Sequence, residues 1–251
     1  MKDKAFWRFY SLVYDTLLRL IPYQKLLQRV IRAIGPPDQT LKILDAGCGT
    51  GNLEMFINQQ AINAAIIGVD STPAMLAIAR KKNRASRKNC RFQPADLNQT
   101  LPFEDSAFDV VVAINVLYAL AQPLESLKEF WRILRPEGRL IIVTPKNKAN
   151  LWPILGEHIR LVQADLKSFW GRLVAWLKMG WLVANLLIVG LLNLIILKRG
   201  RDKKYHFYEL PELEELVTTA GFELEETDSD YGHQDWFLVS RKANGRVDKT
   251  A

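Results

Sequence analysis

The stretch that decides the fold runs from Leu41 to Glu54 and reads Leu-Lys-Ile-Leu-Asp-Ala-Gly-Cys-Gly-Thr-Gly-Asn-Leu-Glu. A short apolar run ends on Asp45, three glycines alternate at Gly47, Gly49 and Gly51, and an apolar helical pattern follows. Glycine tolerates positive φ and lets a backbone approach a ligand closely, and the first N–H groups of a helix are unpaired donors. The stretch therefore predicts a strand, a tight turn and a helix N-terminus that hold a nucleotide-like cofactor. The alternative is a glycine-rich turn that only connects a strand to a helix.

An acidic residue at the end of a second strand strengthens the cofactor interpretation. Residues 65–70 read Ala-Ile-Ile-Gly-Val-Asp, so Asp70 ends this strand about twenty positions after Gly51. An acid in this place can accept hydrogen bonds from the two hydroxyls of a ribose. Asp70 could instead cap the next helix, which Pro73 would start and which Ser71 could cap equally well.

The glycine pattern also separates two classes of cofactor. A dinucleotide fingerprint requires G-x-G-x-x-G, but Asn52 stands where its last glycine would be. With the preceding acid the pattern is D-x-G-x-G-x-G, which resembles motif I of the class I S-adenosylmethionine-dependent methyltransferases, type 11-like. Ala95-Asp96-Leu97 resembles the segment of that family whose acid contacts the adenine amino group, and the sequences flanking 123–134 are similar to its motifs around strands four and five. The resemblance covers residues 41–144, and 222–242 would supply the terminal pair of strands.

The resemblance implies a fold class and a set of site residues. The implied fold is α/β and Rossmann-like: a seven-stranded, mostly parallel sheet with helices on both faces, an N-terminal helical cap and an apolar helical insertion after strand five. The implied cofactor is S-adenosylmethionine, with Asp70 on the ribose, Asp96 on the adenine amino group, and Asp45 and Asn115 near the methionine end. The full set of implied cofactor-binding residues is Asp45, Gly47, Gly49, Gly51, Asp70, Ser71, Met75, Asp96, Leu97 and Asn115. Asp96 could also be a loop acid with no ligand.

The expected elements divide the chain into five parts. Apolar periodicity and turn residues predict strands at 41–45, 65–70, 90–93, 110–114, 139–144, 222–225 and 236–240, and helices at 51–60, 73–82, 123–134 and 209–221. The parts are an N-terminal helical cap (1–37), a cofactor-binding core (38–144), an apolar helical insertion (145–207), the last helix and terminal strands of the same core (208–242), and a polar tail (243–251). Pro22 is expected to break the cap into two helices, the second starting near Gln24. In related methyltransferases such helices cover the cofactor and help form the acceptor pocket; the alternative is ordinary amphipathic packing onto the sheet.

The insertion raises the question of a membrane. Met179 to Leu197 contains no charged residue, and as a helix it would be about 28 Å long, close to the thickness of a bilayer core. A single crossing would separate the last helix and strands from the sheet that they should join. The flanks are rich in tryptophan and basic residues, namely Trp170, Trp176, Trp181, Lys198, Arg199, Arg201, Lys203 and Lys204. We therefore predict a one-sided membrane contact through residues 170–204 that also lines a route for a lipophilic acceptor. The alternative is an apolar cap buried in the protein or in a dimer.

Composition narrows the remaining possibilities. The formal charge is +7 and there are two cysteines, which indicate neither a disulfide framework nor a metal site. The N-terminus has charged residues where a signal peptide needs an apolar core, so we expect a cytoplasmic protein, peripheral or monotopic on the inner face of a membrane. The basic run at 80–88 lacks interleaved aromatic residues, so no nucleic-acid partner is expected.

The expected reaction is in-line methyl transfer to a small, lipophilic or membrane-associated acceptor, with positioning supplying most of the rate enhancement. Tyr14, Tyr118 and His233 are candidates for the acceptor pocket, and no catalytic base is assigned, since His158, His206 and His233 are each more often surface or packed residues. Two other classes stay open: an NAD(P)-dependent Rossmann oxidoreductase, and a non-catalytic membrane adaptor that retains the cofactor fold.

Overall fold

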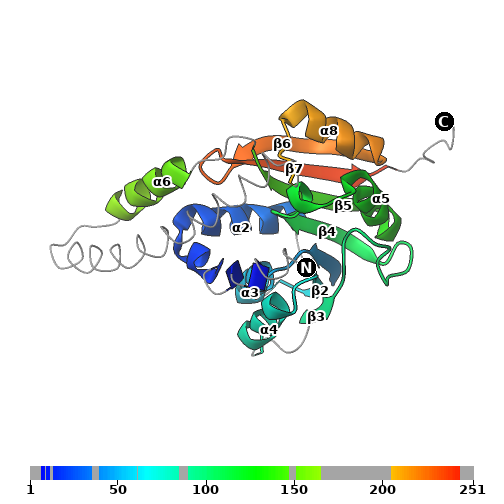
Figure 1. The fold of residues 1–251 in the computed structure, drawn as a ribbon, viewed down its shortest axis with the longest axis horizontal. Helices are drawn as coiled ribbons and strands as arrows, with labels where there is room; N and C mark the ends of the chain where they lie inside the picture. The colour runs from blue at the N-terminus through cyan, green and yellow to red at the C-terminus, as the bar shows by residue number, and fades with distance from the viewer. Residues whose placement is uncertain are drawn as a thin grey trace.

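A computed structural model of the chain describes residues 7–8, 10–11, 14–35, 40–60, 62–84, 90–146, 151–164 and 205–243 (Figure 1). The expected membrane-contact segment 170–204 lies outside these residues, as do most of the polar tail and part of the N-terminal cap. Among the helices that are described, none combines the length and the apolar character needed to span a bilayer.

A seven-stranded sheet forms the centre of the molecule, in the order β3-β2-β1-β4-β5-β7-β6. Its strands are β1 (Leu41–Ala46), β2 (Ala64–Asp70), β3 (Cys90–Pro94), β4 (Phe108–Ile114), β5 (Leu134–Pro145), β6 (Phe222–Asp230) and β7 (Asp235–Lys242). The first five strands are parallel to one another, whereas β7 is antiparallel to both β5 and β6. The predicted seven-stranded, mostly parallel sheet is confirmed.

Helices cover both faces of the sheet (Figure 1). They are α2 (Ile21–Ile34), α3 (Asn52–Gln59), α4 (Pro73–Lys82), α5 (Pro123–Ile133), α6 (Leu151–Ala164) and α8 (Leu210–Thr219), with short 3-10 turns η1 (Asp15–Arg19) and η2 (Leu117–Ala119). The central strand β4 shows why two layers form. Its Val110 and Val112 pack in the core that contains α2 and α3, while Val111 and Ala113 pack in the core that contains α5 and α8. Such a strand, apolar on both faces, is typical of a sheet buried between helices.

The N-terminal cap, which includes α2, packs on one face of the sheet. Helix α6 extends the cap on that face. The second cap helix begins at Ile21, earlier than expected, because Pro22 occupies its first turn, where the missing N–H is not needed. His158 of α6 is buried, and its Nδ1 accepts a hydrogen bond from the Ile21 N–H at 3.2 Å. The described start of the insertion is therefore tied to the cap.

Two strands are longer than the sequence pattern suggested. Residues 135–138, expected to be a turn, belong to β5, whose pairing with β4 shifts register between Phe108 and Val110. Strand β6 continues through an acidic stretch to Asp230, because Arg29 of α2 pairs with Glu226, Asp228 and Asp230.

Candidate cofactor site

The glycine turn folds as a bent loop between β1 and α3. Gly47, Gly49 and Gly51 all have positive φ, at 83°, 53° and 73°. The N–H groups of Gly47 and Cys48 both donate to the Val69 carbonyl of β2, at 2.8 and 2.9 Å. The expected strand, turn and helix N-terminus are thus present, and the turn is fixed against the neighbouring strand.

Among the glycines in the described part of the chain whose surroundings are given, Gly47 has the least space around it. A Cβ built there would lie 2.2 Å from Cγ2 of Val116. We expect Gly47→Ala to lower the free energy of unfolding by about 2–4 kcal/mol, from the positive φ and the forced overlap together. Urea denaturation would measure this. Gly156→Ala is the matched control: a Cβ there meets nothing within 4 Å, so its stability should change by less than about 1 kcal/mol.

Asp70 lies directly against this turn. Its Oδ2 accepts a hydrogen bond from the Gly49 N–H at 3.1 Å, and its Oδ1 accepts one from the Thr72 N–H at 2.7 Å. Burial raises the pKa of Asp70, and the two backbone N–H groups oppose that shift. The carboxylate thus holds the glycine turn and the Thr72 N–H just before α4, and ribose binding by Asp70 stays a prediction.

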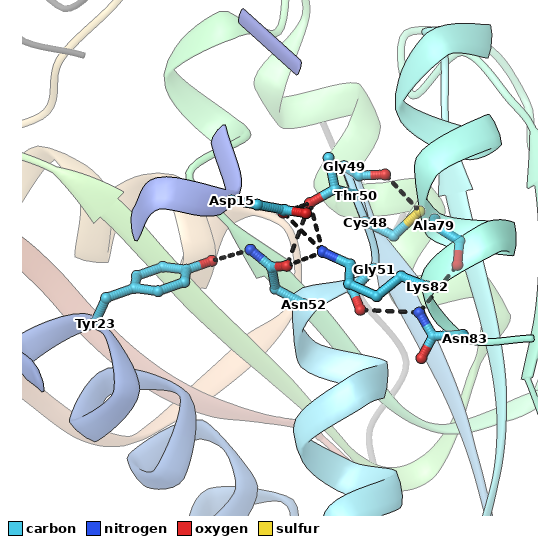
Figure 2. Close-up of polar contacts among 10 residues, drawn as sticks. All are labelled: Asp15, Tyr23, Cys48, Gly49, Thr50, Gly51, Asn52, Ala79, Lys82 and Asn83. Atoms are coloured by element: carbon cyan, nitrogen blue, oxygen red, sulfur yellow. Dashed lines mark hydrogen bonds and ion pairs between the residues drawn. The ribbon is translucent and has the colours of Figure 1, made fainter. Parts of the chain in front are cut away.

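A network centred on Lys82 ties the cap to the turn (Figure 2). The Lys82 ammonium contacts Oδ1 of Asp15 at 2.7 Å, Oγ1 of Thr50 at 3.1 Å, and Oδ1 of Asn52. The Thr50 hydroxyl also donates to Asp15 at 2.6 Å, and Asn52 donates to the Tyr23 hydroxyl at 3.4 Å. Three separate segments, η1, α2 and α4, therefore meet on the glycine turn, and the cap is held closed over it.

A small pocket remains above the turn. It is lined by Tyr14, Tyr23, Leu27, Asp45, Gly47, Cys48, Asn52, Leu53 and Ile114. Tyr14 closes it, since its Cε1 lies 3.7 Å from the position of a Cβ on Gly49. Tyr14 is thus where the sequence placed it, on the wall of the site.

An apolar aromatic cluster adjoins this pocket. Met75 and Tyr118, both predicted site residues, are buried in it with Tyr10 and Tyr205. The Tyr118 ring stacks on Phe207 with centroids 5.3 Å apart. The partly buried members are Trp7, Tyr14, Ala119 and Phe207. Of these residues, Tyr14 also lines the pocket.

Other predicted site residues do not line this pocket. Ser71 and Asp96 are exposed, and Leu97 is buried in the core on the α5 side of the sheet. Asp96 accepts hydrogen bonds from the backbone and side chain of Asn98, both at 3.0 Å, as a loop acid would. His233 is exposed and bonds to Ser229 of its own hairpin at 2.9 Å, so it is not directed into the pocket.

Asn115 lies at the end of β4 beside a residue that the sequence did not single out. Its φ is positive, at 55°, its N–H donates to the Val143 carbonyl, and its side chain acts to lower the pKa of Asp235. Asp235 opens β7 opposite Pro145, the last residue of β5. It therefore stands at the sheet edge where the parallel strands end, the same edge as the glycine turn.

Asp235 is a buried acid whose carboxyl group can still accept a hydrogen bond. The residue is 3% exposed, and within the described part of the chain its Oδ2 has no hydrogen-bond partner. Burial, and then the charge of Asp230, raises its pKa to about 7, against the opposing effects of Asn115 and Lys146. A carboxyl that titrates near neutral pH is suited to proton transfer.

Asp45 shares its surroundings with a second acid, Glu54, in the first turn of α3. Burial, followed by the charge of Asp70, raises the pKa of Asp45 to about 7, and a hydrogen bond from Glu54 lowers it. Burial also raises the pKa of the Cys48 thiol, so the thiol stays protonated and is not a nucleophile.

These residues fit S-adenosylmethionine. Asp45 borders the pocket next to the turn, where it could pair with an ammonium, and Asp70 stands at the adjoining strand end, where ribose hydroxyls would reach it. At Gly49, between these two acids, a Cβ would meet only Tyr14, at 3.7 Å. Among the described residues, no group of three or more metal-ligating side chains is present.

Comparison with known proteins agrees with this geometry. Residues 37–190 match a family model described as a methyltransferase domain. The chain is 37% identical over 132 residues to a demethylmenaquinone methyltransferase of Thermus thermophilus, which is 52% of this chain and 60% of that protein. It is 33% identical over 126 residues to a trans-aconitate 2-methyltransferase of Escherichia coli, which is 50% of this chain and 46% of that protein. The matches thus span about half the length of these relatives.

A solved structure supports the fold independently. Geranyl diphosphate C-methyltransferase from Streptomyces coelicolor, crystallised with Mg²⁺, geranyl diphosphate and S-adenosyl-L-homocysteine, has a TM-score of 0.60 at 11% identity. The similarity covers 88% of this chain and 78% of that one. At this identity the likeness shows the fold alone.

Proposed function

Because this chain belongs to the methyltransferase-domain family, we propose that it transfers the methyl group of S-adenosylmethionine to a small, apolar acceptor. The observation that carries the proposal is the contact of Asp70 with the glycine turn, 3.1 Å from Oδ2 to the Gly49 nitrogen. It joins a carboxylate that could hold the ribose to the glycine turn between β1 and α3. The missing third glycine of the dinucleotide fingerprint argues against the NAD(P)-dependent alternative.

The residues of the chain have separate tasks in this reaction. S-adenosylmethionine, when bound, supplies an electrophilic methyl group. Asp70 holds the ribose hydroxyls and Asp45 pairs with the ammonium of the methionine end. The network around Lys82 keeps the cap over the turn, which excludes water from the site. Displacement then depends mainly on alignment of donor and acceptor.

The aromatic cluster supports an apolar, planar acceptor. Tyr10, Tyr118 and Tyr205 are buried there, and Tyr118 meets the Tyr205 ring edge-on at 5.4 Å. One relative is named for a quinone precursor and the other for a small polyacid. The aromatic members of the cluster favour the apolar class.

We assign the role of general base to Asp235. A hydroxyl on the acceptor could give its proton to the Asp235 carboxylate, while its oxygen electron pair forms the new bond to the methyl carbon. The bound cofactor would supply the methyl carbon, and its sulfur would keep the electron pair of the broken carbon–sulfur bond. Asp235 is supported by its place at the shared strand edge and its orphaned Oδ2.

A one-sided membrane contact remains part of the proposal. Trp152, near the start of α6, is 75% exposed, and it precedes the apolar, tryptophan-rich stretch of the sequence. Tryptophan on an apolar helix is typical of interfacial anchoring. A membrane surface would also deliver a lipophilic acceptor to the cap.

Two measurements test the proposal. Calorimetry should show binding of S-adenosylmethionine and none of NAD⁺; the reverse result would favour the oxidoreductase. Incubation with isotopically labelled cofactor and lipid extracts, followed by mass spectrometry, should show a labelled methyl group in an apolar product.

Membrane contact has its own test. The full chain should float with anionic liposomes, and a variant lacking residues 170–201 should stay in the soluble fraction. Neutral liposomes are the control, because the basic flanks attract anionic lipid. A full chain that stays wholly soluble would contradict the membrane contact without affecting the methyltransferase assignment.

A further inference from the structure

Glu54 is a fully buried acid without an ordinary partner. It lies in the first turn of α3 and is 0% exposed. Neither of its carboxyl oxygens accepts a hydrogen bond from the N–H and O–H groups of the described residues. An ionised carboxylate in such a place would be highly unfavourable, so a buried acid of this kind stays neutral or finds a charge partner.

The sheet makes room for this carboxyl beside Asp45. Asp45 of β1 is paired in register with Gly68 of β2. A Cβ on Gly68 would lie 2.5 Å from Oε1 of Glu54 and 3.0 Å from Cβ of Cys48. The Glu54 carboxyl therefore occupies the space that a side chain of residue 68 would fill, next to the Asp45 side chain on the same face of the sheet.

Two carboxyl groups in contact can form a hydrogen bond only when one of them carries a proton. The register of Asp45 with Gly68 and the position of the Glu54 carboxyl at Gly68 place the two acids next to each other; a hydrogen bond between them would lower the pKa of Asp45 and raise that of Glu54. Asp45 borders the pocket, whereas Glu54 lies beneath it. The more deeply buried acid is the one expected to keep the proton.

We propose that Glu54 is a positioning residue that keeps its proton at neutral pH and donates it to Asp45, so that Asp45 is held as an anion facing the cofactor pocket. The inference rests on the proposed function, because the anion is there to pair with the ammonium of S-adenosylmethionine. It assigns a task to Glu54 and explains why residue 68 is glycine although its φ is ordinary.

The charged groups around the pair are consistent with a protonated Glu54 and an ionised Asp45. The titratable groups that interact with the pair are Tyr23 on α2, Cys48 in the turn, Asp70 at the end of β2, Lys82 on α4 and Cys90 on β3. Burial and the charge of Asp45 raise the pKa of Glu54, while Lys82 lowers it from a distance. The hydrogen bond shifts the two acids in opposite directions, raising the pKa of Glu54 and lowering that of Asp45.

The test uses two variants of similar size. Glu54→Gln keeps a donor for Asp45, whereas Glu54→Met fills the space without one. Calorimetry with S-adenosylhomocysteine between pH 6 and 8.5 should give wild type and Glu54→Gln affinities within about threefold at each pH. Glu54→Met should bind about tenfold more weakly at pH 7, since a hydrogen bond to a charged group is lost. The difference in affinity between Glu54→Met and wild type should shrink as the pH rises, because Asp45 then ionises even without a hydrogen bond from residue 54.

A second variant guards against a misfolded Glu54→Met. Gly68→Ala should displace the Glu54 carboxyl and reproduce the same shift of the affinity–pH profile to higher pH. If Glu54→Gln shifts the profile as Glu54→Met does, or if neither Glu54→Met nor Gly68→Ala shifts it, the inference is wrong.

Stability of the ligand-free protein separates this inference from the proposed function. An acid whose folded pKa is raised gives stability that is lost as the pH rises through that pKa. The wild-type free energy of unfolding should therefore fall as the pH rises from the ordinary glutamate pKa of 4.5, and Glu54→Gln should flatten that fall. If wild type binds no S-adenosylhomocysteine but the flattening is seen, the shared proton stands and the proposed function fails. An unchanged slope in Glu54→Gln would overturn the shared proton itself.

Discussion

Replacing Asp70 by alanine is expected to weaken binding of S-adenosylmethionine by about one to two orders of magnitude while the chain stays folded. The carboxylate would accept two ribose hydroxyls, and hydrogen bonds to a charged group contribute about 1.5–3 kcal/mol. The change also removes the acceptor that holds the Gly49 N–H. Isothermal titration calorimetry measures the affinity, and circular dichroism with thermal unfolding checks the fold.

A matched control separates this effect from the loss of any acid. Asp105→Ala removes a carboxylate whose side chain is 78% exposed and pairs with Arg132 away from the turn. Its affinity for the cofactor should be unchanged. Equal affinities of wild type and Asp70→Ala would contradict the assignment of the ribose site.

The sequence predicted those features of the fold and site that depend on residues close together in the chain. A strand, three glycines and a helix start lie within fourteen residues, and each feature has one dominant physical reason, so the turn could be predicted. Asp70 followed because a strand, a turn and a helix fix the distance to the next strand end. The apolar run of β4 likewise predicted a strand buried on both faces.

Contacts between distant segments could not be predicted. Lys82 reaches Asp15, Thr50 and Asn52 from the end of α4, yet in sequence it is one of several basic residues on a helix expected to face solvent. Nothing in the spacing of these residues requires them to meet, because the long lysine side chain can point in many directions.

Other site residues were missed or misplaced for reasons of topology. Glu54 looked like an ordinary first-turn acid, and only the register of Asp45 with Gly68 shows where its carboxyl goes. His233 seemed close to the acceptor by order along the chain, but the hairpin between β6 and β7 directs it to solvent. Asp235, two residues further along, is buried instead, because it lies in β7 and pairs with Pro145 at the end of β5.

The larger effect is expected at Asp235, where Asp235→Asn should lower the turnover number by about 10²–10⁴-fold, the range typical of a lost general base. Cofactor affinity should change little, because Asp45 and Asp70 supply those contacts. Asp228→Asn is the control on the same hairpin: Asp228 is exposed and pairs with Arg29, so turnover should be unchanged.

The pKa of Asp235 also predicts the direction in which turnover should change with pH. Burial raises the pKa of Asp235 to about 7, and only the ionised form accepts a proton, so wild-type turnover should rise through pH 7 and then level. Steady-state rates between pH 5.5 and 8.5 would show this, and the small residual rate of Asp235→Asn should lose the inflection.

The stability of Asp235→Asn should rise while its turnover falls. This difference distinguishes a catalytic from a structural role. A folded pKa of about 7 lies above the ordinary value of 3.8, so the fold favours the neutral acid and loses stability as the pH rises through 7. Asp235→Asn supplies a neutral side chain at every pH, and it should therefore unfold at a higher temperature than wild type at pH 8 and lose that advantage at pH 4. A variant that is slower and also less stable at pH 8 would show that Asp235 supports the fold and does not take the proton.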